Sequence, residues 1–424
     1  MKIALIYSFD DSDWFSCNII LKNLIKSYQT IYDQDSLLHI NYDYQGEVES
    51  RDLVSLRDKE VTKIIFVDHK PSPLRLIKQL SELNDGELPN KEYIFHVYGD
   101  FPLYIRDWRS IANRTKDRSV KFICASKKQQ KFVQQFYQQK DLVFYSPFPV
   151  DKKEFFWDSN LRQKTRSQFN LTDEIVFIYT GRLSQQKRIT DLIDNFYVAL
   201  EKKNIPKNSK LFIVGEFDNL GVPYLGLGHI NNEYFRSVDK TIQSHVQFKK
   251  NIILMPSQPH EKLNALYNMA DIYVSLSTYH DEDFGMSVAE SLCTGIKALL
   301  TNWAGFSSFQ LANIGAVSLV PVDLDQRWPR INEQVLQKEF QQIISDLNRR
   351  ADYALGHIEF FGIEANSKRI KEILGKEVPD FSSCSETMVE LLAENLANGY
   401  HMFKDDTDLK FNDLYNKVYN VYAE

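Results

Sequence analysis

Two glutamates on either side of a glycine are the residues of this chain best placed to do chemistry. Glu282 and Glu290 stand eight positions apart, and the apolar run 271–277 before them has the composition of a buried parallel strand. Residues 286–293 predict a helix, which Gly295 would end. Free N–H groups at the beginning of a helix bind phosphate, and the carboxylates can accept hydrogen bonds from hydroxyl groups. The stretch therefore predicts a site for a phosphate between two hydroxyl-bearing groups, as in a sugar nucleotide.

A second group of polar residues follows the apolar run 174–179. Gly181 can turn the backbone there, and Arg182 and Lys187 come next. Because ligands of open parallel sheets bind beyond the carboxyl ends of the strands, these two cations should reach the same site as the glutamates. The planar fork of arginine and the point charge of lysine together suit a diphosphate.

Each group also has a simpler structural explanation. Acidic residues are common in the first turn of any helix, where they complement the helix dipole. A basic turn after a strand is equally common on protein surfaces. The prediction of a binding site therefore depends on both groups occurring in one chain, and on the elements that position them.

Short apolar runs alternate with amphipathic segments along the whole chain. This alternation predicts an α/β protein with two doubly wound parallel sheets. In the first half we expect strands at 2–7, 63–68, 92–97, 121–126 and 141–145, and helices at 16–28, 73–83, 106–114 and 128–137. In the second half we expect strands at 174–179, 210–216, 251–255, 271–277, 297–302 and 316–321, and helices from 190 and at 260–269, 286–293, 332–347, 363–374, 385–398 and 408–421.

The length of 424 residues exceeds one ordinary core, so two domains are expected. Pro147 and Pro149 interrupt regular structure, and the polar span 152–172 that follows is the predicted hinge. We therefore predict a first domain at 1–158, a second at 159–380 and a helical extension at 381–424.

The composition bounds the kind of protein. With 43% hydrophobic and 25% charged residues the chain has the make-up of a soluble globular protein, and a net charge of -6 argues against nucleic-acid binding. Its four cysteines are scattered, which favours reduced thiols in the cytoplasm. The chain begins with a strand pattern rather than a signal peptide, and no run approaches the ~20 apolar residues of a membrane span. Any membrane contact should therefore be peripheral, at the inner face.

The predicted helix 128–137 combines lysines with aromatic residues. A solvated amphipathic helix explains this pattern, and contact with a membrane surface is the alternative. The residues concerned are Lys127, Lys128, Lys131, Phe132, Phe136, Tyr137 and Lys140.

Two further features lie where strands of the first half end. His96 ends the strand 92–97 close to Asp100, so both are candidate site residues, although a lone histidine there also suits a structural hydrogen bond. The loop 8–15 follows the first strand and contains no glycine, so it is a poor cradle for phosphate. Its acids and Trp14 suit contact with an acceptor or with sugar hydroxyls, and a solvated loop with aspartate caps is equally compatible.

The second half resembles the nucleotide-binding half of GT-B glycosyltransferases, close to the retaining glycosyltransferase family 4. Three motifs carry this resemblance in the family's order: Gly181-Arg182-Leu183-Ser184 with Lys187, Ile213-Val214-Gly215-Glu216, and Glu282 to Glu290. The resemblance implies two Rossmann-like domains facing a cleft, with the final helix, 405–424, crossing back to the first domain. One departure is the loop 8–15, where the family usually has a glycine-rich turn.

The resemblance also implies a reaction and roles for individual residues. The chain would transfer a sugar with retention from a nucleotide-sugar donor, a UDP-sugar before a GDP-sugar, to a glycan or glycolipid in cell-surface polysaccharide synthesis. No cofactor and no metal are implied. Arg182 and Lys187 would neutralise the leaving diphosphate. Glu290 would bind the ribose, Glu282 would bind the transferred sugar, and His96 would lie near that sugar. The pocket for the diphosphate would be formed by Gly181, Gly215, Phe284, Gly285, Met286 and Ser287.

Retaining enzymes of this kind are thought to let the acceptor hydroxyl attack on the face of the leaving group, with the departing phosphate taking the proton. No dedicated protein base is therefore expected. Two alternatives stay open on the same scaffold. One is a sugar-nucleotide epimerase or hydrolase, and the other is a catalytically silent partner subunit of another transferase.

Overall fold

The computed structural model describes residues 2–8, 15–42, 48–67, 72–99, 101–217, 220–222, 227–228, 233–278, 282–324, 329–397 and 415–423. The chain forms two compact units. Unit 1 comprises Met1–Pro149 and Gly362–Asn398, and unit 2 comprises Val150–Phe361 and Gly399–Glu424.

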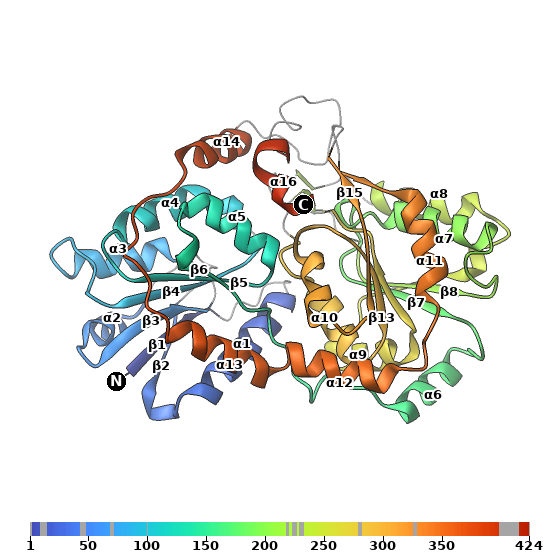
Figure 1. Ribbon diagram of the computed structural model, residues 1–424, viewed down its shortest axis with the longest axis horizontal. Coiled ribbons are helices and arrows are strands. Elements are labelled where there is room, and N and C mark those ends of the chain that lie inside the picture. Colours follow the sequence, from blue (N-terminus) through green and yellow to red (C-terminus); the bar gives the residue numbers. More distant parts are fainter. Residues whose placement is uncertain are drawn as a thin grey trace. The chain divides into compact units, whose positions relative to one another are not determined.

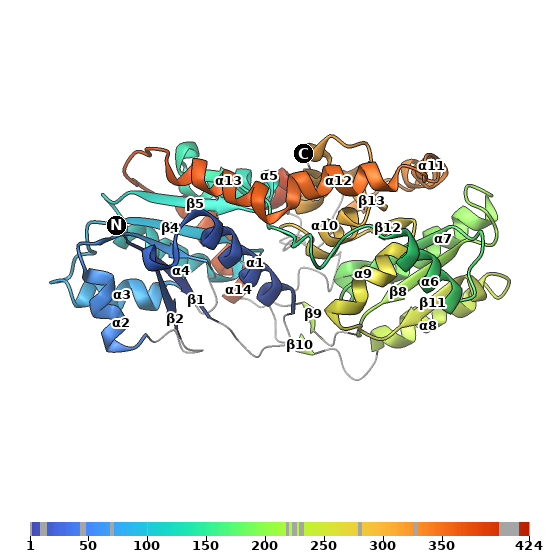
Figure 2. The same cartoon turned by 90° about the horizontal axis from the view of Figure 1, so that it is seen from below.

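Unit 1 is built on a six-stranded parallel sheet with the strand order β2-β1-β3-β4-β5-β6 (Figure 1). Figure 2 shows α13 on one side of this sheet and α2, α3 and α4 on the other. The strands are β1 Lys2–Tyr7, β2 Leu37–Asn41, β3 Val61–Phe66, β4 Glu92–Val97, β5 Val120–Cys124 and β6 Val143–Tyr145. The helices are α1 Phe15–Ile31, α2 Ser50–Arg57, α3 Leu74–Glu82, α4 Ile105–Arg114, α5 Lys127–Tyr137, α13 Ile363–Leu374 and α14 Glu386–Ala397.

Unit 2 repeats the plan with the strand order β11-β8-β7-β12-β13-β14, again parallel (Figure 1). Its strands are β7 Val176–Thr180, β8 Lys210–Val214, β11 Ile252–Met255, β12 Ile272–Ser275, β13 Lys297–Thr301 and β14 Val317–Val320, with the pairs β9 Leu220–Val222 and β10 Leu227–Gly228, and β15 Val322–Asp323 and β16 Arg330–Ile331. Its helices are α6 Ser159–Gln168, α7 Ile189–Glu201, α8 Glu233–Ser244, α9 His260–Met269, α10 Met286–Cys293, α11 Glu333–Ile343, α12 Arg350–Phe361 and α16 Asn420–Ala423.

The predicted fold class is confirmed. Strands such as β4 and β12 are buried almost throughout, because helices cover both faces of a doubly wound sheet. Their near-continuous apolar runs were therefore readable from the sequence. Strand β2, by contrast, was missed: it lies at the edge of its sheet, alternates between buried and exposed residues and carries the exposed His39.

The polar span 152–172, predicted to be a hinge, contains helix α6 and belongs to unit 2. Asp158 caps this helix by accepting hydrogen bonds from the amides of Asn160 and Leu161, at 2.8 and 3.1 Å. Arg162 on α6 then forms an ion pair of 2.7 Å with Asp271, whose side chain is only 6% exposed. The charges that resembled those of a linker therefore serve to dock a helix.

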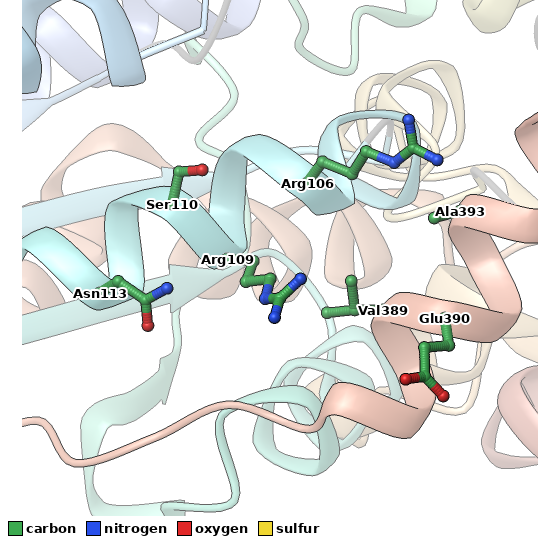
Figure 3. Close-up of a pocket in the computed structure, with 7 residues that line it drawn as sticks. All are labelled: Arg106, Arg109, Ser110, Asn113, Val389, Glu390 and Ala393. Atoms are coloured by element: carbon green, nitrogen blue, oxygen red, sulfur yellow. The ribbon is translucent and has the colours of Figure 1, made fainter.

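The C-terminal residues, predicted to form one helical extension at 381–424, are divided between the two units. Helix α14 lies in unit 1 beside α4, where Arg109 holds Glu386 through two contacts of 3.1 and 2.8 Å. Figure 3 shows the pocket between these two helices. It is lined by Arg106, Arg109, Ser110, Asn113, Val389, Glu390 and Ala393.

The last described residues belong to unit 2 rather than to the first unit. They form a π-helical turn, Tyr415–Tyr419, and α16, and the ring of Tyr422 lies 5.9 Å from that of Trp303. The chain instead enters unit 1 between Phe361 and Gly362, which differs from the predicted crossing by the helix 405–424. Among the described residues no helix has the length and apolar character needed to cross a membrane.

Helix α5 directs its aromatic residues into the core of unit 1. Phe132 and Phe136 are at most 1% exposed, and Tyr137 stacks on Phe122 with ring centroids 4.0 Å apart. The apolar face of this basic helix is therefore covered by its own unit, which favours the solvated-helix interpretation over insertion into a membrane.

Candidate active site

The predicted site residues of unit 2 gather where the strand order reverses. The chain runs outward from β7 through β8 to β11, and then from β12 through β13 to β14 on the other side. Ligands of open α/β sheets bind at such a switch point, beyond the carboxyl ends of the strands. Gly181 directly follows β7, and the loop to α10 follows β12 (Figure 1). The two motifs that are a hundred residues apart in sequence thus meet at one edge.

Two glycines let neighbouring strand ends approach closely here. The amide of Gly181 donates to the carbonyl of Val214 at 3.1 Å, and that of Leu183 donates to Glu216 at 2.8 Å. A Cβ atom on Gly215 would overlap the carbonyl oxygen of Gly181. The first and second motifs are therefore one structural unit, and Gly215 is required for its backbone contact.

The central feature of the site is an ion pair between Lys187 and Glu282. The ammonium group lies 2.5 Å from Oε2 of the carboxylate, and the side chains are only 15% and 10% exposed. Lys187 ends a short 3-10 turn, Gln185–Lys187. The next residue, Arg188, is 8% exposed and donates to Thr278 at 2.7 Å, so it anchors the turn that presents Lys187.

Two tyrosines are close enough to Glu282 for its charge to raise their pKa values, and neither was identified as a site residue from the sequence. The hydroxyl of Tyr179 donates to the carbonyl of Arg182 at 2.9 Å. Burial raises the pKa of Tyr179 well above its usual value, the charge of Glu282 raises it further and that of Arg182 lowers it. Both charged groups therefore act on one hydroxyl. Tyr273 donates to the carbonyl of Thr180 at 3.0 Å.

Helix α10 begins at the same place. Gly285 caps it with a φ of 98°, a left-handed conformation that favours glycine, and an added Cβ would lie 2.6 Å from the ring of Phe306. The amides of Val288 and Ala289 donate back to Gly285, so those of Met286 and Ser287 come before the first intrahelical hydrogen bonds. The helix thus offers the arrangement of amides that binds an anion.

One residue of the predicted pocket has a different position. Phe284 is 1% exposed, and its ring packs against Phe309 and Phe361 with centroids 5.1 and 5.9 Å apart. Its side chain belongs to the core of unit 2. Phe284 therefore supports the loop from below instead of lining the pocket with its ring.

Glu290 is enclosed and has a histidine as its partner. It is 4% exposed, and Nε2 of His260 lies 3.2 Å from its Oε1. Burial raises the pKa of Glu290, whereas the hydrogen bond and charge of His260 lower it. This contact could not be predicted from the sequence, because the two residues come from different helices, α9 and α10.

His96 lies in unit 1 and is only 2% exposed. Its Nε2 shares a hydrogen bond of 2.7 Å with the hydroxyl of Tyr28, and burial lowers its pKa to about 3. This environment is that of a neutral histidine with a structural hydrogen bond. Asp100 and residues 9–14 of the glycine-free loop lie outside the described residues.

Comparison with known proteins agrees with the geometry of unit 2. Residues 162–342 match the sequence profile of the family described as glycosyl transferases group 1. That segment contains both cations, both glutamates and the glycines discussed above. No curated protein sequence matches the chain closely enough to count as a relative.

Solved structures resemble nearly the whole chain. HepE of Anabaena, solved with UDP and glucose, has a TM-score of 0.60 at 14% identity, over 89% of this chain and 100% of that one. A glycosyltransferase from Rickettsia africae has a TM-score of 0.60 at 16% identity, over 89% and 99%. Sucrose-phosphate synthase from Thermosynechococcus elongatus has a TM-score of 0.56 at 15% identity, over 88% and 98%.

At these identities the likeness establishes the fold. The two parallel sheets and these neighbours define the fold as GT-B. The segment 162–342, which matches the group 1 glycosyl transferases, lies within unit 2 and contains the site built around Lys187 and Glu282.

Proposed function

We propose that this protein is a retaining glycosyltransferase that moves a sugar from a UDP-sugar to a glycan or glycolipid acceptor. The observation that carries this proposal is the Lys187–Glu282 pair, which sets a cation and a carboxylate side by side next to the glycine-led start of α10. UDP is favoured because HepE, which has a similar fold, has been solved in complex with UDP and with UDP-glucose.

Each group of the site then has a role toward the donor. Lys187 and Arg182 bind the diphosphate together with the amides of Met286 and Ser287. Glu290 accepts hydrogen bonds from the ribose hydroxyls. Because Glu282 neutralises Lys187 in the ion pair, a diphosphate would compete for the ammonium group and leave the carboxylate for the hydroxyls of the sugar.

The chemistry follows from the charges. Cleavage of the sugar–phosphate bond builds negative charge on the leaving diphosphate and positive charge on the sugar ring. Preorganised cations and amide dipoles stabilise the first of these. The acceptor hydroxyl attacks from the face of the leaving group and passes its proton to the departing phosphate, so the configuration is retained. We propose that the two cationic side chains make a metal ion unnecessary.

The acceptor and the cellular location are part of the same proposal. A role in cell-surface polysaccharide synthesis places the protein in the cytoplasm, with peripheral contact at the inner membrane face. Among the described residues, Cys124, Cys293 and Cys384 are buried and form no disulfide bond, which supports a reducing compartment. Since the aromatic residues of α5 are in the core, membrane contact through this helix would rely on exposed lysines such as Lys131.

Fold likeness alone does not separate a transferase from its rivals. The N-terminal domain of Candida albicans trehalose-6-phosphate phosphatase also matches, with a TM-score of 0.54 at 10% identity, over 89% of this chain and 97% of that one. An epimerase, a hydrolase and a silent partner subunit therefore need an experimental test.

UDP is expected to raise the melting temperature of the protein more than GDP or ADP does. A ligand at a hundred times its Kd stabilises the folded state by about 2.7 kcal/mol, which corresponds to roughly 5–11 °C for a domain of this size. Thermal-shift measurements with each nucleotide and its sugars check this. Product analysis by NMR should then show acceptor-dependent transfer with retention. Turnover without acceptor would indicate a hydrolase or epimerase, and no response to any nucleotide would indicate a silent subunit.

A further inference from the structure

A histidine outside the sequence motifs lies between two carboxylates in unit 2. Nε2 of His260 is 3.2 Å from Oε1 of Glu290, and its Nδ1 is 3.7 Å from Oε2 of Glu154. The ring of Phe155 packs edge-on against the imidazole, with centroids 4.9 Å apart. Both nitrogens of the ring thus have an acidic partner.

The position of Glu154 is fixed by the backbone around it. Its amide donates to the carbonyl of Asp151 at 2.9 Å. Two residues later, the amide of Phe156 donates to Asn264 on α9 at 3.2 Å, and Asn268 on α9 returns a hydrogen bond to its carbonyl at 2.9 Å. The segment that carries Glu154 is therefore fastened to the helix that begins with His260.

A charged histidine suits this arrangement best. Neutral imidazole has one N–H group, so one nitrogen would turn a lone pair toward a carboxylate. Although burial lowers the pKa of His260, the hydrogen bond and charge of Glu290 raise it. The charges of Glu154 and of the adjacent Glu261 raise it further, so that the net pKa lies above the usual 6.5.

Glu290 depends on this partner. Its other titratable neighbours are Tyr267, Cys293 and Glu154. The first two are buried groups whose own pKa values are raised, and the charge of Glu154 raises the pKa of Glu290, so none of the three supplies a positive charge. The hydrogen bond from a charged His260 is therefore the contact that can hold Oε1 of Glu290 in place.

We propose that His260 is a positioning residue for donor binding, which aims the Glu290 carboxylate so that it can accept hydrogen bonds from the ribose diol of a nucleoside diphosphate. This inference rests on the proposed function, since it assigns ribose binding to Glu290. The imidazolium is present below the pKa of His260 and is lost as the pH rises through it. Glu290 then stays ionised, but it loses the charge-assisted hydrogen bond that holds its Oε1 in place. Affinity for the nucleotide should therefore fall over the same interval.

The test is the Kd of UDP for the full-length protein, measured by calorimetry from pH 5.5 to 8.5. The wild-type protein is expected to lose about tenfold in affinity across this range, because a charge-assisted hydrogen bond is weakened. His260→Gln keeps an N–H donor but no charge, and it should bind weakly at all pH values. The ratio of the two Kd values at each pH cancels the ionisation of UDP itself.

Two further measurements separate this role from a purely structural one. Glu154→Gln removes one acidic partner, so the fall in affinity should move to lower pH while His260 stays in place. With 2′-deoxy-UDP the pH dependence should shrink, since one of the two hydroxyl groups is missing. A Kd ratio that does not change with pH, together with an unshifted profile for Glu154→Gln, would overturn the role of His260 and leave the proposed function intact. Failure of UDP to bind at any pH would overturn both.

Discussion

Replacing Lys187 with alanine should lower kcat/KM for sugar transfer by about 10²–10³-fold, the usual loss when one group that stabilises a developing oxyanion is removed. The ammonium group is 2.5 Å from Glu282 and 15% exposed, so it is held at the site before the donor arrives. The loss should appear in steady-state kinetics with UDP-sugar at a fixed acceptor concentration. Lys131→Ala, an exposed lysine of α5 in the other unit, is the matched control and should be near wild type.

The same ion pair gives a prediction of opposite sign for nucleotide binding. Glu282→Gln releases Lys187 from its partner, and UDP carries no sugar for Glu282 to bind. UDP should therefore bind this variant at least as tightly as the wild type, whereas Lys187→Ala should bind it more weakly. Calorimetric titration of both variants checks this. Equal weakening in the two variants would mean that they act by disturbing the loop, which would contradict a direct role of Lys187 in phosphate binding.

Asp271→Asn should destabilise unit 2 by about 3–5 kcal/mol, as expected when a buried ion pair loses one partner. Asp271 holds four groups of three segments together: its carboxylate contacts Arg162 at 2.7 Å, the amide of Val176 at 2.9 Å, and Arg166 and Arg350 at 3.6 Å. The asparagine is of the same size but removes the anion that the guanidinium groups of Arg162, Arg166 and Arg350 share.

Chemical denaturation followed by tryptophan fluorescence measures this loss. Glu386→Gln is the control, because it breaks the pair with Arg109 in which the side chains are 53% and 47% exposed. An exposed pair of this kind contributes at most about 1 kcal/mol. If the two variants were equally stable, Asp271 would not be the link that docks α6 against the sheet.

The elements that were predicted correctly are those whose burial requires a recognisable pattern of apolar residues. Strands β1 and β4 and helices α9, α10 and α13 have the predicted bounds, because each carries a continuous apolar run or a capped amphipathic face. The segments α6 and β2 were missed for the opposite reason. The charges of α6 resemble those of a linker until Asp271 is seen to neutralise them.

The site was predictable as far as its residues follow strand ends. Lys187 and Glu282 are in contact and Gly285 caps α10 beside them, since parallel strands bring their carboxyl ends to one edge. The contacts among them were not predictable, because they join residues far apart in the chain. The enclosure of His96, the core position of Phe284 and the partner of Glu290 are all of this kind.

The central claim is that one place in unit 2 holds the diphosphate between the cations and the start of α10. A crystal structure of the protein with UDP tests it most directly. The account predicts phosphate oxygens within about 3 Å of the Lys187 ammonium group and of the Met286 and Ser287 amides, with the ribose hydroxyls on Glu290. UDP bound elsewhere, or with its phosphates away from Lys187 and α10, would contradict it.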